Sequence, residues 1–154
     1  MRAYFFGNFY LSSIQQGIQT AHVVAELALT FMPPTATDVC LDSASCKMWD
    51  WAENYKTIII LNGGDSLALD ELYKELMPIA EQLDLPCAVF QEDNRSLNEA
   101  TTCVGIVLPE SLYDYNLKAE LDTISYGIAA DIGEIPLSIE GQLKQILNRY
   151  RLAQ

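Results

Sequence analysis

Histidine and closely paired cysteines, the residues that most often hold structural metal ions, are scarce in this sequence. There is one histidine, His22, and none of the four cysteines forms a C-x-x-C pair. A structural zinc site needs four such ligands, so the sequence predicts no metal site. Cys87 and Cys103 lie within apolar runs and are expected to be reduced and buried. A disulfide between Cys40 and Cys46 is geometrically feasible, but the cytoplasmic location expected below argues against it.

Positive charge is also scarce. Nine Lys and Arg residues face 21 Asp and Glu residues, which gives a net charge of −12. Nucleic-acid binding takes much of its free energy from Lys and Arg side chains that neutralise phosphates, so DNA binding is not expected and general RNA binding is disfavoured. A basic cluster occurs near the C-terminus, at Lys144, Arg149 and Arg151, and a local basic patch there stays open.

Long hydrophobic runs are missing as well. No apolar run approaches the ~20 residues that a membrane-spanning helix requires, so no membrane partner is expected. The first residues, MRAYFFGNFYLSS, alternate like a strand and lack an A-x-A-like cleavage site, which favours mature protein over a signal peptide. A chain of 154 residues with 50% hydrophobic and 19% charged residues is expected to form a soluble cytoplasmic protein with a proper core and no cofactor.

Residues 12–32, SSIQQGIQTAHVVAELALTFM, predict one long amphipathic helix. Steps of three and four residues predict a core-facing stripe of Ile14, Ile18, Ala21, Ala25, Ala28 and Met32. The neighbouring row is polar and contains Gln15, Gln19, His22 and Glu26. Ser12 or Ser13 is expected to cap the helix, with a glutamine three residues later completing a capping box. The polar row thus begins where a strand-like segment, 3–11, passes into a helix, which is a frequent place for a site in an open α/β sheet.

Strand-like and helical segments alternate along the chain. The strand-like segments are 3–11, 56–61, 85–90 and 101–108, and further helices are expected at 46–54, 66–83, 112–124 and 138–152. This order predicts an α/β domain of three layers, with a four-stranded mixed sheet and helices on both faces. The last two strands are free to pair antiparallel. We place that domain at 1–109 and a C-terminal helical extension, packed on it, at 110–154. Asn62, Gly63 and Gly64 are expected to form an ordinary strand-to-helix turn.

Four segments carry a resemblance to a known family: GIQTAHVVAE (17–26), KTIIIL (56–61), LPCAVFQEDNRS (85–96) and TTCVGIVLPE (101–110). In this order they resemble the type II peptidyl-tRNA hydrolase family. There, a strand leads through a lysine-containing turn into a helix with a Q-C-S-H motif, and Gln19, Thr20, Ala21 and His22 match that motif. The family's D-x-G-R-T loop is similar to residues 92–96, and its T-V-x-G-I strand to residues 102–106. The resemblance implies the family's fold over residues 3–109.

The resemblance also implies a cleft and its residues. It places the catalytic positions at Gln15, His22, Glu92 and Thr102, and ligand-binding positions at Ser13, Gln19, Asp93, Arg95 and Ser96. The family's catalytic lysine, seven residues before the motif histidine, falls on Gln15, and a second lysine falls on Ser13. The family's acidic residue falls on Glu92, or on Asp93 if the loop is shifted by one residue.

These departures bear on the expected activity. Cleaving the ester of peptidyl-tRNA needs an activated water, a stabilised oxyanion and positive charge against the phosphates. Gln15 can donate a hydrogen bond but carries no charge, and the net charge of −12 opposes tRNA. We therefore expect a binding or regulatory module that kept the cleft or uses its C-terminal extension, with a protein or small ligand as partner.

Two alternatives stay open. One is a weakened peptidyl-tRNA hydrolase, or a related ester or amide hydrolase, in which tRNA is a partner and His22 is the base, oriented by Glu26. The other is a structural or assembly protein that forms a homo-oligomer through the final helix or through the region of Trp49 and Trp51.

Overall fold

One open mixed sheet forms the centre of the molecule. The computed structural model describes residues 1–31, 43–93, 99–129 and 136–153. Its strands are β1 (Arg2–Asn8), β2 (Ile58–Gly64), β3 (Cys87–Gln91) and β4 (Thr101–Leu108), in the spatial order β2-β1-β4-β3. β1 runs parallel to β2, and β4 runs antiparallel to both β1 and β3. The predicted α/β class and the four-stranded mixed sheet are confirmed.

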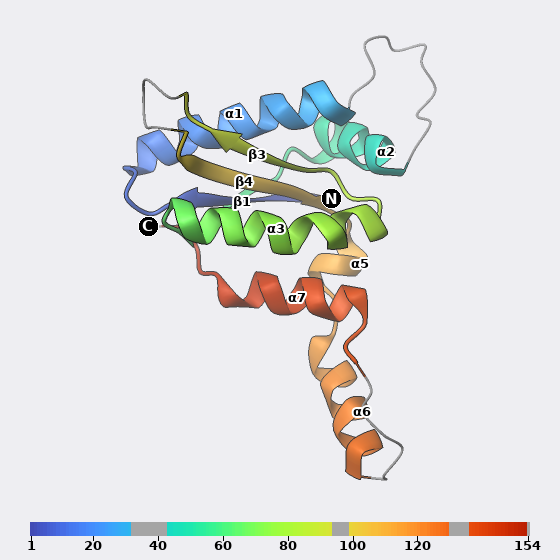
Figure 1. Cartoon of the computed structure of the whole chain (residues 1–154). Helices are drawn as coiled ribbons and strands as arrows, with labels where there is room; N and C mark the ends of the chain where they lie inside the picture. Colours follow the sequence, from blue (N-terminus) through green and yellow to red (C-terminus); the bar gives the residue numbers. More distant parts are fainter. Residues whose placement is uncertain (32–42, 94–98, 130–135, 154) are drawn as a thin grey trace.

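Helices lie on both faces of this sheet (Figure 1). α1 (Ser13–Phe31) follows β1 and packs over β3 and β4, with α2 (Ser43–Asp50) beside it. A π-helical turn, η1 (Trp51–Tyr55), continues α2. α3 (Ser66–Gln82) follows β2 and packs on the opposite face, as Figure 1 shows. The sheet therefore separates two apolar layers.

The β1 side chains alternate between these two layers. Phe5 packs among the residues under α1, and Phe6 packs among those under α3. The predicted buried stripe of α3 is confirmed, because Leu69, Leu72, Leu76 and Ile79 are buried and Leu83 packs against them. Asp65 caps α3 by accepting a hydrogen bond from the Ala68 backbone N–H (2.9 Å), as expected.

The predicted core stripe of α1 was wrong. Its buried residues are Gln16, Gln19, Thr20, Val23 and Leu27. Of the predicted stripe, Ala28 does pack against the core, but Ile14 is 79% exposed and Ile18 50% exposed, Ala21 and Ala25 are exposed as well, and Met32 lies outside the described residues. The helix has apolar residues on two opposite faces, so its period cannot decide which face meets the sheet.

Polar contacts at the start of α1 decide its rotation. The Gln16 side-chain amide donates to the backbone carbonyls of Asn8 (3.4 Å) and Leu11 (3.1 Å), and the Asn8 carbonyl also accepts from the Leu11 backbone N–H (3.2 Å). Ser12 forms the predicted capping box with Gln15: Ser12 N–H donates to Gln15 Oε1 (2.9 Å), and Gln15 N–H donates to Ser12 Oγ (3.3 Å).

β2 is longer than the sequence predicted. Asn62, Gly63 and Gly64 extend the strand and do not form the expected turn. A Cβ at Gly63 would lie 3.0 Å from the Phe6 Cβ, so glycine lets the strand stay close to β1 here. The chain terminus pairs with the other edge of β2, because Asn62 N–H donates to the Arg151 carbonyl (2.9 Å) and Ala153 N–H donates to the Ile60 carbonyl (3.0 Å).

The segment after β4 contains three helices: α5 (Glu110–Tyr113), α6 (Leu117–Ala129) and α7 (Ile139–Arg149). The single helix expected at 112–124 was therefore wrong, since it is divided between α5 and α6. The predicted apolar face of α7 is confirmed, with Leu143, Ile146 and Leu147 buried against α3. α6 projects away from the sheet (Figure 1). The division at residue 109 stays a prediction.

The cysteines follow the predictions in part. Cys87 and Cys103 are free and buried, as expected, and burial raises the pKa of each thiol to about 12. Cys46 is disulfide-bonded, so the expectation against a disulfide was wrong, and Cys40 lies outside the described residues. That expectation depended on an assumed compartment, which the sequence does not determine. In the described part of the chain, no helix is both long enough and apolar enough to cross a membrane.

Two glycines allow a matched test of the α1–β4 contact. A Cβ at Gly105 would lie 2.7 Å from Val23 Cγ1 and 2.8 Å from Phe5 Cδ1, whereas a Cβ at Gly17 would meet nothing within 4 Å. We expect Gly105→Ala to lower the free energy of unfolding by about 1–3 kcal/mol through overpacking. Gly17→Ala should raise it by about 0.5–1 kcal/mol, because it removes a mid-helix glycine. Urea unfolding of both variants measures this, and equal shifts would contradict the packing described.

The contacts of Glu120 at the junction of α6 and α7 predict that the stability of the protein depends on pH. Ser138 N–H donates to Glu120 Oε1 (2.6 Å) and the Tyr115 hydroxyl donates to Glu120 Oε2 (3.1 Å). These bonds, led by the one from the Ser138 backbone, lower the pKa of Glu120 from its ordinary 4.5. The stabilisation is therefore present above that ordinary value and is lost as the pH falls through the lowered pKa.

We expect wild type to be more stable than Glu120→Gln near neutral pH. The difference should shrink as the pH falls through the lowered pKa of Glu120, below which both side chains are uncharged. Urea unfolding of the two proteins side by side checks this, and a difference that is independent of pH would argue against the carboxylate contact.

Candidate functional site

A group of polar and aromatic side chains connects α1 to β3 and β4. We call it the Gln19 cluster, and its members are Gln19, His22, Phe90, Glu92 and Thr102. Gln19 Nε2 donates to Glu92 Oε1 (2.7 Å), and Thr102 Oγ1 donates to Gln19 Oε1 (3.0 Å). Gln19 and Thr102 are buried and Glu92 is half-buried. Residues from three distant parts of the chain therefore meet through one carboxamide.

An irregularity in β4 directs Thr102 toward this cluster. Along β4, Cys103 and Val107 pack under α1, while Val104 and Ile106 pack under α3. Strict alternation would turn Thr102 toward α3, but the β3–β4 register shifts between Phe90 and Gln91, where Thr101 and not Thr102 is the partner of Gln91. Thr102 is thus the extra residue of a β-bulge, and a bulge re-aims side chains in this way.

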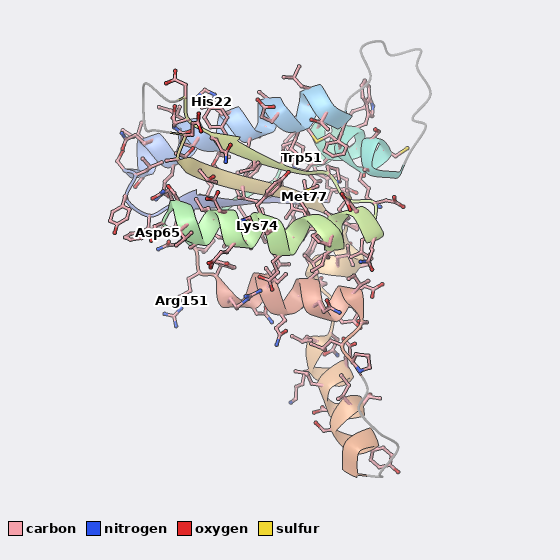
Figure 2. The ribbon with its side chains drawn as sticks, in the orientation of Figure 1. His22, Trp51, Asp65, Lys74, Met77 and Arg151 are labelled. Atoms are coloured by element: carbon pink, nitrogen blue, oxygen red, sulfur yellow. The ribbon has the colours of Figure 1, made fainter. Side chains whose placement is uncertain are left out.

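His22 occupies the exposed margin of the cluster, on the α1 side of the sheet (Figure 2). Its ring stacks on Phe90, with ring centroids 4.4 Å apart and an interplanar angle of 14°. Among the described contacts, neither a hydrogen bond nor an ion pair joins His22 to Glu26. The histidine is therefore held by stacking and not oriented by the carboxylate that the sequence suggested.

The other predicted site residues are placed differently. Gln15 is exposed, and its Oε1 accepts hydrogen bonds from the Ser12 backbone N–H and from Ser12 Oγ, both at 2.9 Å. Ser13 is the exposed first residue of α1, and Asp93 is exposed beyond Glu92. Arg95 and Ser96 lie outside the described residues. The structure thus brings together Gln19, His22, Glu92 and Thr102 but leaves Gln15 in the helix cap.

A second polar network lies toward α3 and was missed by the sequence reasoning. Thr101 Oγ1 donates to Asp70 Oδ1 and accepts from Gln91 Nε2 (3.2 Å). Asn8 Nδ2 donates to Ser66 Oγ (3.1 Å). The adjacent threonines 101 and 102 were the available signal, since two buried hydroxyls next to each other must reach partners on both faces of the sheet.

The polar side chains of these networks bind one another. Among the described residues, every buried side-chain nitrogen or oxygen has a hydrogen-bond partner. In the same part of the chain, no group of three or more His, Cys, Asp or Glu side chains could hold a metal ion. Electrostatic catalysis needs donors aimed at a position where charge will develop. The Gln19 cluster instead uses the amide and hydroxyl donors of Gln19 and Thr102 to connect α1 with the strands.

Two cavities lie outside the Gln19 cluster. One, of about 260 Å³, is lined by the ends of α1 and α3, including Phe31, Met77 and Cys87. The other, of about 240 Å³, lies between the β1–α1 turn and the chain terminus and is lined in part by Gln16 and Arg151. Neither cavity includes a residue that the sequence singled out as catalytic.

No family model matches the chain, and no curated protein matches it either. The resemblance to the type II peptidyl-tRNA hydrolases therefore stays a prediction.

The Gln19–Thr102 hydrogen bond can be tested by a double-mutant cycle. Gln19→Leu leaves the Thr102 hydroxyl with only its longer bond to the Phe90 carbonyl (3.5 Å), and Thr102→Val removes the donor to Gln19 Oε1, so each should lower the free energy of unfolding by about 1–3 kcal/mol. The double variant should cost less than the sum of the two, because the loss of the Gln19–Thr102 bond is then counted once, while Glu92 loses its Gln19 donor equally in both Gln19 variants. Gln15→Leu serves as the exposed control and should cost less than about 1 kcal/mol. Strict additivity in urea unfolding would count against the bond.

Proposed function

We propose that the protein is a non-catalytic binding module on a type II peptidyl-tRNA hydrolase-like fold. Two features support this proposal. The order of strands and helices from β1 to β4 agrees with the order that the resemblance implies. Gln19, His22, Glu92 and Thr102, which match family positions from separate segments, meet in one cluster.

The environment of Gln15 carries the non-catalytic part of the proposal. The resemblance places the family's catalytic lysine at this position. Gln15 has no charge, and its side-chain carbonyl is occupied by two hydrogen bonds from Ser12. None of the five members of the Gln19 cluster is a lysine or arginine. The described cluster therefore lacks the cation that would stabilise an oxyanion or contact a phosphate.

The overall charge favours a protein partner over tRNA. Each phosphate contact of a nucleic-acid complex draws on a lysine or arginine, and this chain has nine against 21 acidic residues. Gln19 and Thr102 are buried, so a partner would meet the exposed margin of the cluster at His22. A stacked aromatic pair, His22 on Phe90, offers such a partner a rigid apolar contact.

The exposure of His22 favours a second candidate, a weakened peptidyl-tRNA hydrolase. The imidazole stands one helical turn from Gln19 and could accept a proton from a water at the surface of the cluster. In this version His22 is the general base, and Glu92 acts through Gln19 and not directly on the histidine.

Peptidyl-tRNA hydrolysis by the purified protein separates the two candidates. We expect no turnover by the unmodified protein. Gln15→Lys should gain turnover, because a donor aimed at developing charge contributes about 10²–10³ in rate. The matched control is Gln82→Lys, which adds the same charge at an exposed site on α3 and should gain nothing. Turnover by the unmodified protein that His22→Ala abolishes would contradict the binding module and establish the hydrolase.

A further inference from the structure

The outer face of α1 is an apolar strip that no described residue covers. We define this outer face by Ile14, Gly17, Ile18, Ala21, Ala25 and Leu29, which follow one another at steps of one, three or four residues. Ile14 is 79%, Ile18 50% and Leu29 80% exposed. Gly17, Ala21 and Ala25 are exposed too. At 1.5 Å per residue, the strip is about 22 Å long.

The opposite face of the same helix is already buried in the core. Val23 and Leu27 are fully buried under the sheet contact, so α1 is apolar on both faces. Large exposed apolar patches on a protein mark sites of interaction with other proteins or membranes. The two regions that the sequence suggested for assembly are used within the chain, since Trp51 is buried and Leu143 and Ile146 of α7 pack on the core.

We propose that this outer face is a homodimer interface, in which α1 of one copy packs antiparallel on α1 of a second copy. The residue pattern suits a two-fold axis beside Ala21 and His22. Such an axis sets Ile14 opposite the partner's Leu29 and Ile18 opposite the partner's Ala25. Large side chains thus meet at the two ends, and small ones near the centre let the helix axes come within 8–10 Å.

The absence of charge on the strip is what allows a second copy to bind there. Each chain carries a net charge of −12, so two copies repel across most surfaces. α1 has one formally charged residue in its 19, Glu26, and Glu26 is not on the outer face. Because α1 contains no lysine or arginine, it lacks the basic polar face of helices that lie on membranes. The uncharged strip therefore fits the same strip of another copy.

The size of the strip and its acidic surroundings predict how the dimer behaves. One helix face of this length gives an interface below the ~1,200 Å² at which standard stable complexes begin, so we expect a weak dimer with a dissociation constant in the micromolar range or above. Glu26 is the one charged residue of α1, and each chain carries a net charge of −12, so the two copies repel each other. Raising the salt concentration should therefore tighten the dimer, because salt screens repulsion between exposed charges.

Sedimentation equilibrium of the full chain tests the interface. The wild-type protein should show a concentration-dependent monomer–dimer equilibrium. Ala25→Glu should weaken it by at least about 100-fold, because it places two carboxylates in an apolar contact. Gln145→Glu adds the same charge at an exposed site on α7 and should leave the equilibrium unchanged. Both positions are exposed, so unchanged far-UV circular dichroism should accompany either result.

Disulfide trapping tests the antiparallel register. Ala21→Cys lies beside the two-fold axis and should form a disulfide-linked dimer under mild oxidation. Ala25→Cys should not, because its two copies are separated by about 10 Å along the helices, beyond the ~7 Å limit for the Cα atoms of a disulfide. The free cysteines Cys87 and Cys103 are buried, and wild type serves as the blank.

Three results would overturn the proposal. One is a wild-type protein that stays monomeric at all concentrations. A second is equal disulfide trapping at both positions, which indicates a parallel or random encounter. The third is a monomer that binds vesicles of neutral phosphatidylcholine and loses that binding in Ala25→Glu, which assigns the strip to a membrane surface. Dimerisation through α1 is independent of whether the protein hydrolyses peptidyl-tRNA.

Discussion

The rotation of α1 about its own axis is the constraint on which the rest of this structure depends. Gln16 bonds two carbonyls of the β1–α1 turn, Gln19 joins Glu92 to Thr102, and Val23 fills the space that Gly105 leaves. Turning the helix to bury Ile14 and Ile18 would expose Val23 and Leu27 in exchange, so hydrophobic burial changes little. Each buried amide or hydroxyl left unpaired would cost about 1–3 kcal/mol. Hydrogen bonding therefore selects the face, although both faces are apolar.

This rotation determines two neighbouring surfaces of α1. It places Gln19 in the core with both amide atoms bonded, and it leaves His22 at the margin, stacked on Phe90. It also turns Ile14 and Leu29 to solvent, as a strip along a nearly uncharged helix in a strongly acidic chain. The Gln19 cluster and the outer face of α1 share one boundary, the row that contains His22. A dimer through the strip would bring two such boundaries together.

The described part of residues 110–153 covers the free edge of β2 and part of the α3 side of the sheet. The chain terminus covers the free edge of β2 through the hydrogen bonds of Asn62 and Ala153, which shields an edge strand that could otherwise aggregate. α7 fills the α3 side with Leu143 and Ile146, while α6 is held at its base by the carboxylate of Glu120. The C-terminal segment thus contributes both to the core and to the sheet.

Local patterns in the sequence determined the strands, the cap of α3 by Asp65, the buried stripe of α3 and the capping box at Ser12. Each depends on residues within a few positions of one another. Tertiary structure alone decided the rotation of α1, the bulge at Thr102 and the extension of β2 through Gly64. These depend on partners distant in sequence, such as Gly105 against Val23, Gln91 against Thr101 and Arg151 against Asn62. A period of 3.6 residues identifies the apolar faces of a helix, but only the partner's shape and its unpaired polar groups choose between two of them.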